Sequence, residues 1–126
     1  MSYLWELDFV VLAPLLQQAL DHGGNTHTIE DVKDMIVRGE AQFWPGDNAA
    51  VVTEIIRYPR KRVCNLWLAS GDLAEIDRIG ACVSEWAAES GCDQLTLHGR
   101  PGWARHFRDD PTVRVDRVTL VRELRK

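Results

Sequence analysis

The sequence has no long apolar run, and its first residues are not basic. No stretch of its 126 residues approaches the roughly 20 apolar residues that a membrane-spanning helix needs. The N-terminal MSYLWELDF carries acidic residues where a signal peptide carries basic ones. The sequence therefore predicts no membrane segment and a protein that stays in the cytoplasm of the cell that makes it.

Cysteine is scarce, and basic charge is not in excess. Cys64, Cys82 and Cys92 form an odd set without CxxC spacing, which argues against a disulfide framework or a zinc knuckle and predicts reduced, packed thiols. With 15 basic and 19 acidic residues, the net charge of -4 predicts no bulk affinity for nucleic acid. The composition, 45% hydrophobic and 27% charged, is that of one globular domain over residues 1–126.

Two helices are predicted near the N-terminus. Leucines and alanines at helical spacing predict a helix over about 9–22, in which Pro14 fits only near the start. Thr28 and Asp31 resemble a capping box and predict a second, short helix that ends at Gly39.

The remainder of the chain predicts strands interrupted by one long helix. β-Branched and aromatic runs predict strands, and the basic YPRKR between two of them predicts an antiparallel hairpin. Asp72 caps a helix that Gly91 ends, and the strand after it makes a right-handed parallel crossover. A short helix opened by Pro101 precedes the last strand. The predicted strands are 40–44, 49–58, 62–69, 93–99 and 113–124.

These elements predict an α/β (α+β) domain with a mixed sheet. It has two N-terminal helices, an antiparallel three-strand segment and one parallel strand-helix-strand crossover. The core is expected across that crossover, with Leu73 also facing the sheet. The side chains expected to be largely buried are Trp67, Ile76, Val83, Trp86, Leu95 and Leu97.

This order of elements resembles the GNAT N-acetyltransferase fold over nearly the whole chain. The segments GEAQFW, VVTEIIRYP and GCDQLTLHGRPGWARHF are similar to small GNAT-like proteins of phage and prophage gene sets. The resemblance implies a structural, virion-associated or assembly protein that contacts other phage-particle components. It also implies an alternative, a divergent acyl-CoA-dependent N-acetyltransferase.

In GNAT enzymes the acyl-CoA pyrophosphate lies on a helix start, held by a loop resembling Q/R-x-x-G-x-G/A. The matching positions here read ASGDLA, residues 69–74, with one glycine and no preceding Arg or Gln in the expected place. Asp72, as helix cap, occupies the N–H groups and the partial positive charge that a phosphate would use. The sequence therefore predicts no cofactor. If acetyl-CoA does bind, the resemblance assigns Ser70, Gly71 and Leu73 to it.

The catalytic groups that the fold implies are also incomplete. Phe107 and Arg108 stand where the resemblance would place a tyrosine acid, so no catalytic residue is predicted. In the alternative, enzymatic interpretation Glu54 is the base; otherwise it is a carboxylate on a solvated strand face or paired with an arginine. His98 and His106 lack a third ligand of evident spacing and predict no metal site.

Two basic segments are candidate partner surfaces. Residues 100–108 combine arginines with aromatic residues, and Arg and Trp are enriched in interface hot spots. Packing of the aromatics with solvated arginines is the alternative. The basic hairpin is either a solvated turn or a local contact with acidic protein or nucleic acid. The partner-binding candidates are Arg100, Trp103, Arg105 and Arg108, together with Arg60, Lys61 and Arg62.

Overall fold

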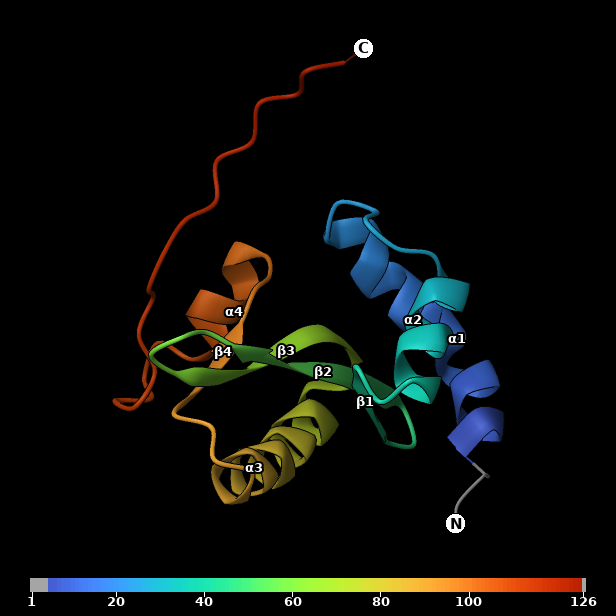
Figure 1. The fold of residues 1–126 in the computed structure, drawn as a ribbon, viewed down its shortest axis with the longest axis horizontal. Coiled ribbons are helices and arrows are strands. Elements are labelled where there is room, and N and C mark those ends of the chain that lie inside the picture. Colours follow the sequence, from blue (N-terminus) through green and yellow to red (C-terminus); the bar gives the residue numbers. More distant parts are fainter. Residues whose placement is uncertain (1–4, 126) are drawn as a thin grey trace.

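The computed structural model describes residues 5–125, which form helices on both sides of a central sheet (Figure 1). The order of elements along the chain agrees with the sequence prediction as far as residue 106. The elements are α1 (Trp5–His22), α2 (Ile29–Val37), β1 (Gln42–Pro45), β2 (Ala49–Arg57), β3 (Arg62–Gly71), α3 (Leu73–Glu89), β4 (Gln94–Leu97) and α4 (Pro101–His106).

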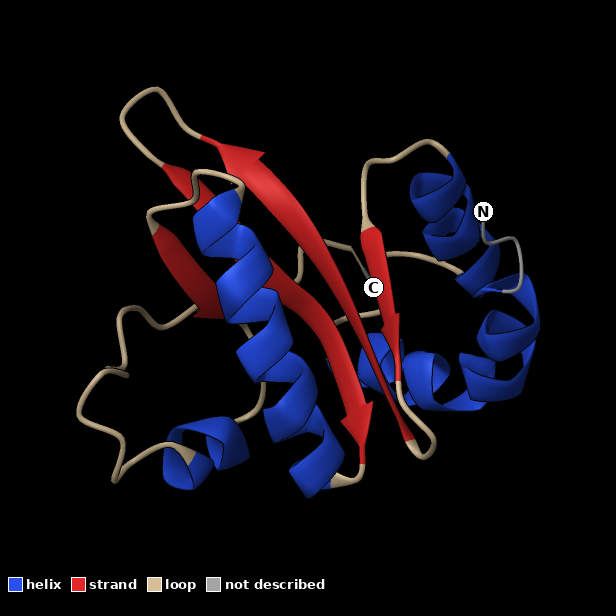
Figure 2. Ribbon diagram, turned by 90° about the horizontal axis from the view of Figure 1, so that it is seen from below, coloured by secondary structure: helices blue, strands red, loops and turns tan. Residues whose placement is uncertain are grey.

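The sheet is mixed, as predicted. Its strand order is β1-β2-β3-β4; the first three strands are antiparallel, and β4 runs parallel to β3 after the crossover through α3. Helix α3 lies across one face of the sheet, and α1 and α2 cover the other (Figures 1 and 2). The predicted α/β (α+β) architecture is therefore confirmed.

Two cores form because β2 is buried on both faces. Successive side chains of a strand point to opposite sides of the sheet. Ala50 and Val52 pack with the α1 and α2 residues, while Ala49 and Val51 pack with the α3 residues. A run of small and β-branched residues is what such a strand requires.

Helix α1 starts earlier than predicted and contains Pro14 well inside it. A proline removes one helical hydrogen bond, and for that reason the sequence predicts that Pro14 lies near the start of the helix. Leu12, Leu16 and Leu20, four residues apart, are all buried and hold the helix through this point, while Pro14 itself is exposed. Packing outweighs the local penalty. In α2 the predicted capping box is present, with the Thr28 Oγ1 accepting from the Asp31 N–H at 3.1 Å.

The predicted core is confirmed in part. Ile76 and Val83 are buried, and Trp67, Trp86 and Leu97 are partly buried. Leu95 is 38% exposed and Leu73 is 50% exposed, so both predictions of burial are wrong. Leu95 lies on an edge strand of four residues, and Leu73 is the first residue of its helix.

The cysteines differ in environment. Cys64 is buried in the sheet, and this burial raises the pKa of its thiol to about 11, with Cys92 nearby adding to the shift. A thiol with so high a pKa stays protonated at neutral pH and is a weak nucleophile. Cys82 is exposed on α3, so the prediction that all three thiols are packed is wrong for it.

The last predicted strand is also wrong. Residues 113–125 form no strand and pair with no other element among the described residues. They run away from the rest of the domain as an extended tail (Figure 1). Alternating apolar residues predict a strand, but a strand also needs a neighbour to share its backbone hydrogen bonds.

Candidate functional site

Two carboxylates lie at the start of α3, where the GNAT resemblance places a phosphate site. Asp72 caps the helix, its Oδ2 accepting from the Glu75 N–H at 3.0 Å. Glu75 Oε1 in turn accepts from the Asn48 N–H at 2.9 Å. The Asp72 N–H donates to the Asn48 carbonyl, also at 2.9 Å. The β1–β2 turn is therefore bonded directly against the helix start.

Gly71 is explained by packing between strands. Its φ is +116°, which a side chain rarely adopts, and a Cβ there would lie 2.3 Å from the Asn48 carbonyl oxygen and 2.6 Å from Ala49 Cα. This glycine lets the end of β3 approach the start of β2. The resemblance also assigns Ser70 and Leu73 to acetyl-CoA. Ser70 donates to the Gln18 side chain at 3.3 Å, and Leu73 is exposed.

Strands β3 and β4 diverge beyond Leu66 and Leu97, their last paired residues. In the β2–β3 register Val52 faces Leu68 and Thr53 faces Leu66, so Trp67 is the extra residue of a β-bulge. Such a bulge bends its strand and interrupts regular pairing, which accounts for the separation from β4.

A groove of about 80 Å³ opens where the two strands separate. It is bounded by β3, the residues that follow β4, the first part of α4 and the C-terminal end of α1. The structure thereby brings together three residues that the sequence could only place separately, Ser70, Arg100 and Trp103. Ligand pockets usually measure about 300–1,000 Å³, so this groove is smaller than a typical ligand pocket.

Glu54 belongs to a polar chain that crosses three strands. Asn65 Nδ2 donates to Glu54 Oε2 at 3.1 Å, and Thr96 Oγ1 donates to Asn65 Oδ1 at 3.0 Å. Asn65 is buried and Glu54 is partly buried, and the chain lies one paired position before β3 and β4 diverge. Glu54 is thus held by an amide rather than by an arginine. The one feature of the sequence that indicates this polar chain is the single asparagine within the apolar run RVCNLWLA.

The segment 100–108 combines a packed side and a charged side. Trp103 packs against the α3-side core and stacks on Phe107 with ring centroids 6.3 Å apart. His106 Nε2 lies 2.9 Å from Asp77 Oδ1 and links α4 to α3. The arginines of the segment are exposed, and within residues 5–125 none of them forms an ion pair or a side-chain hydrogen bond: Arg100, Arg105 and Arg108.

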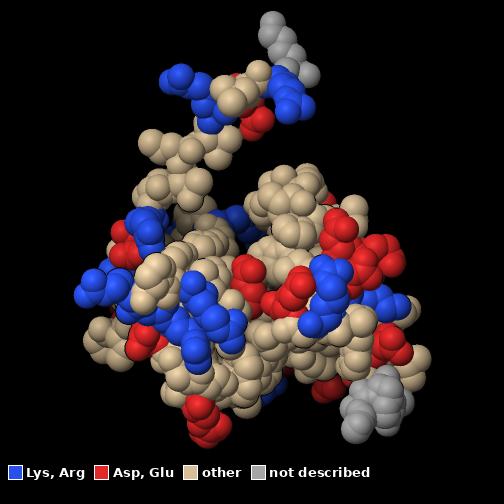
Figure 3. Space-filling model, viewed as in Figure 1, with Lys and Arg blue, Asp and Glu red and all other residues tan. Residues whose placement is uncertain are grey.

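The basic hairpin is partly committed to the fold. Arg62 donates from its guanidinium to the Ser90 carbonyl at 2.8 Å and from its backbone to Asp93 Oδ2 at 3.0 Å. Lys61 Nζ reaches Gln94 Oε1 at 3.3 Å. Arg60 is exposed at the turn. Basic side chains gather at this end of the molecule and on the tail (Figure 3).

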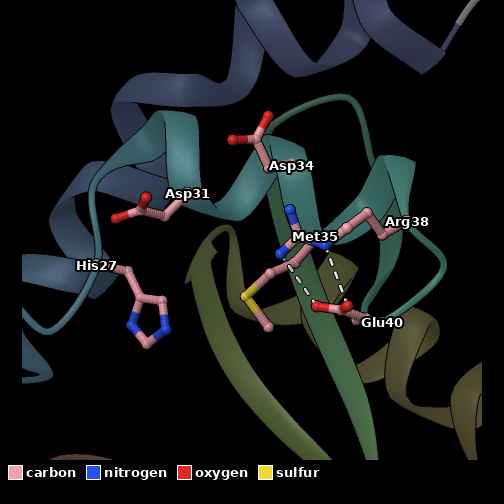
Figure 4. Close-up of a pocket in the computed structure, with 6 residues that line it drawn as sticks. All are labelled: His27, Asp31, Asp34, Met35, Arg38 and Glu40. Carbon is pink, nitrogen blue, oxygen red and sulfur yellow. Dashed lines mark hydrogen bonds and ion pairs between the residues drawn. The ribbon is translucent and has the colours of Figure 1, made fainter.

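A larger, open cavity of about 240 Å³ lies beside α2 (Figure 4). Arg38 donates to Glu40 at 3.0 and 3.1 Å, which lowers the pKa of that carboxyl. Asp31 is bonded to the Thr28 backbone and side chain, which likewise lowers its pKa. Asp31, Arg38 and Glu40 are thus bonded to neighbouring residues and exposed to solvent.

Residues 5–125 contain neither a cluster of potential metal ligands nor a helix suited to spanning a membrane. No group of three or more His, Cys, Asp or Glu side chains in this range is arranged to hold a metal ion. No helix in the same range is both long enough and apolar enough to cross a membrane.

The chain matches no protein-family model and no curated protein. Solved structures with a similar fold are known, and they include an acetyltransferase. BH1408 of Bacillus halodurans, solved as a tetramutant, is 14% identical with a TM-score of 0.67, covering 94% of this chain and 95% of that one. Wild-type TTHA1254 of Thermus thermophilus is 13% identical with a TM-score of 0.61, covering 94% of each chain. An acetyltransferase of Trypanosoma brucei is 13% identical with a TM-score of 0.56, covering 86% of this chain and 92% of that one.

Proposed function

We propose that this chain uses its GNAT-like fold as a scaffold for protein–protein assembly without acyl transfer. The fold is the starting point for a functional assignment, but by itself it does not establish the chemistry. We propose further that its partners are components of a phage or prophage particle. The observation that supports the first proposal is the start of α3, where the Asp72 carboxylate accepts from the Glu75 N–H and the Glu75 carboxylate accepts from the Asn48 N–H.

Electrostatics argues against a pyrophosphate at this helix start. The Glu75 N–H already donates to the Asp72 carboxylate, so one of the free helix N–H groups is used. Two negative groups about 4 Å apart repel by about 1 kcal/mol in water and by several near a protein surface. The Asn48 turn, bonded to Glu75 and to the Asp72 N–H, also lies directly against this helix start.

Acetyl-CoA is expected to give no saturable heat in calorimetry and no thermal shift. A ligand at 100 times its dissociation constant would stabilise the fold by about 2.7 kcal/mol, which a melting curve detects. The matched variant is Asp72→Asn, which keeps a capping oxygen and removes the charge. Micromolar binding by the unaltered protein would contradict the proposal; binding only by the variant would show a site suppressed by charge.

The proposed partner surface consists of the unpaired arginines of segment 100–108 and the exposed hairpin residue Arg60. Unpaired arginines keep all their donors available for carboxylates on a partner. Lys61 and Arg62 contribute less, because their side chains are bonded within the domain. An acidic protein surface is the proposed partner; a local nucleic-acid contact is the alternative for the hairpin.

Reversing charge at Arg100 and Arg105 together, to Glu, is expected to remove the chain from purified particles without unfolding it. The side chains are exposed, so the melting temperature should stay within a degree or so of the parent. The readout is mass spectrometry of particles from cells carrying each tagged variant. Lys33→Glu with Arg78→Glu is the control, since it makes the same change of charge elsewhere. Absence of the unaltered chain from the particles would refute the particle role.

A divergent N-acyltransferase is the second candidate, and the divergence of β3 and β4 favours it. The groove between these strands adjoins Ser70, and the Glu54–Asn65–Thr96 chain lies one paired position away. In this alternative Asn65 orients the Glu54 carboxylate as a general base. The acetyl-CoA experiment separates the two candidates, because only an enzyme of this kind requires the thioester to bind.

A further inference from the structure

The tail, residues 113–125, has an extended backbone and the side-chain pattern of a strand, but it pairs with no other strand among the described residues. In the described chain, no hydrogen bond joins residues 114–125 to any other part of the domain. Large apolar side chains along it are between 71% and 91% exposed: Val115, Val118, Leu120, Val121 and Leu124. They fall on both faces of an extended backbone, the pattern of a strand that is covered on both sides.

The sheet offers one edge that such a strand fits. Among the described residues β4 pairs with β3 alone, so its outer backbone groups have no partner strand. Its residues, QLTL, include neither a charge nor a proline, the features that usually protect an edge. The opposite edge, β1, carries Pro45, which has no N–H to donate. Leu95 on β4 is itself 38% exposed.

Charge also favours an attraction between tail and domain. Residues 113–126 hold five basic and two acidic side chains, a net charge of +3. Residues 1–112 hold 10 basic and 17 acidic side chains, a net charge of -7. The tail of one molecule is therefore attracted to the body of another, and complementary charge speeds such an encounter.

We propose that residues 113–125 add as a strand to the β4 edge of a second copy of this chain, so that two copies exchange their tails. The tail leaves α4 and projects away from its own domain (Figures 1 and 3). Each copy of the chain has one tail and one free β4 edge, so two copies can each accept the other's tail. The exchange satisfies backbone groups on both partners and covers the apolar side chains of the tail. It is independent of whether acyl-CoA binds.

The test is the mass of the full chain by sedimentation equilibrium. At about 100 μM, an interface with a dissociation constant near 10 μM is mostly filled, so twice the single-chain mass of 14.3 kDa is expected. Val118→Lys with Leu120→Lys should reduce the mass to that of one chain. The matched control, Val10→Lys with Val11→Lys on exposed positions of α1, should remain double.

Other outcomes count against the proposal. A single-chain mass for the unaltered protein overturns it. A dimer that survives the tail variant, or that the α1 variant also dissociates, overturns it too, because the contact then lies elsewhere or is unspecific.

Hydrogen exchange supplies the second readout. In the unaltered protein, amides of β4 and of the tail should be protected together and should lose protection together in the tail variant. Protection in a protein of single-chain mass would mean that the tail pairs with its own β4, and would equally refute exchange.

Discussion

Leu16→Ala is expected to lower the free energy of unfolding by about 2–5 kcal/mol, because it removes buried methyl groups and leaves a cavity. Leu16 is 0% exposed and lies in the core between α1, α2 and the sheet. Its loss also weakens the packing that holds α1 across Pro14. Urea denaturation monitored by tryptophan fluorescence gives the change, provided that the slope with denaturant stays constant.

Leu7→Ala is the matched control, since it makes the same chemical change on the same helix. Leu7 is 66% exposed, so its truncation should stay within about 0.5 kcal/mol of the parent. Equal costs for the two variants would mean that α1 does not sit on the sheet as described.

Gly71→Ala is expected to destabilise the domain by about 3 kcal/mol, since it combines backbone strain at a positive φ with a clash against backbone. The clash cannot be relieved by a side-chain rotation, because the nearest atoms are the Asn48 carbonyl oxygen and Ala49 Cα. A thermal melt measures the effect without any ligand present. This tests the structural explanation of the only glycine in the ASGDLA loop.

Gly80→Ala is the contrasting control. Gly80 lies inside α3, and an added Cβ meets nothing within 4 Å. Replacing a helical glycine by alanine should stabilise the domain by about 0.4–1 kcal/mol. If Gly71→Ala instead left the melting temperature unchanged, the close approach of β2 and β3 would be wrong, and the glycine would again be a candidate for ligand binding.

Local patterns predicted most of the elements correctly because each rests on short-range physics. The capping box of Thr28 and Asp31, the N-cap at Asp72 and the β-branched run of β2 appear in the structure where the sequence predicts them. Hydrophobic period and turn residues were also enough to predict the hairpin and the parallel crossover. The missing phosphate glycines were evident from the sequence as well.

The candidate site depends on contacts between distant residues, which no local pattern contains. The sequence marks Asp72 as a cap but does not indicate that Glu75 bonds the Asn48 turn, 27 residues earlier. Nor does it indicate that Ser70 and Arg100 share a groove, since that depends on the bulge at Trp67. Nor does the basic segment YPRKR indicate that the side chains of Lys61 and Arg62 form hydrogen bonds within the domain while Arg60 stays exposed.

Short-range patterns in the sequence account for the order of elements as far as α4, for the mixed sheet and for the Asp72 cap, because periodicity, capping and backbone conformation act over a few residues. Only the tertiary structure decided that α1 continues through Pro14, that Asn65 bridges Glu54 and Thr96, and that residues 113–125 remain unpaired. A strand pattern records which side chains favour extended backbone. Whether the strand forms depends on a neighbouring edge, which is a property of the assembled fold.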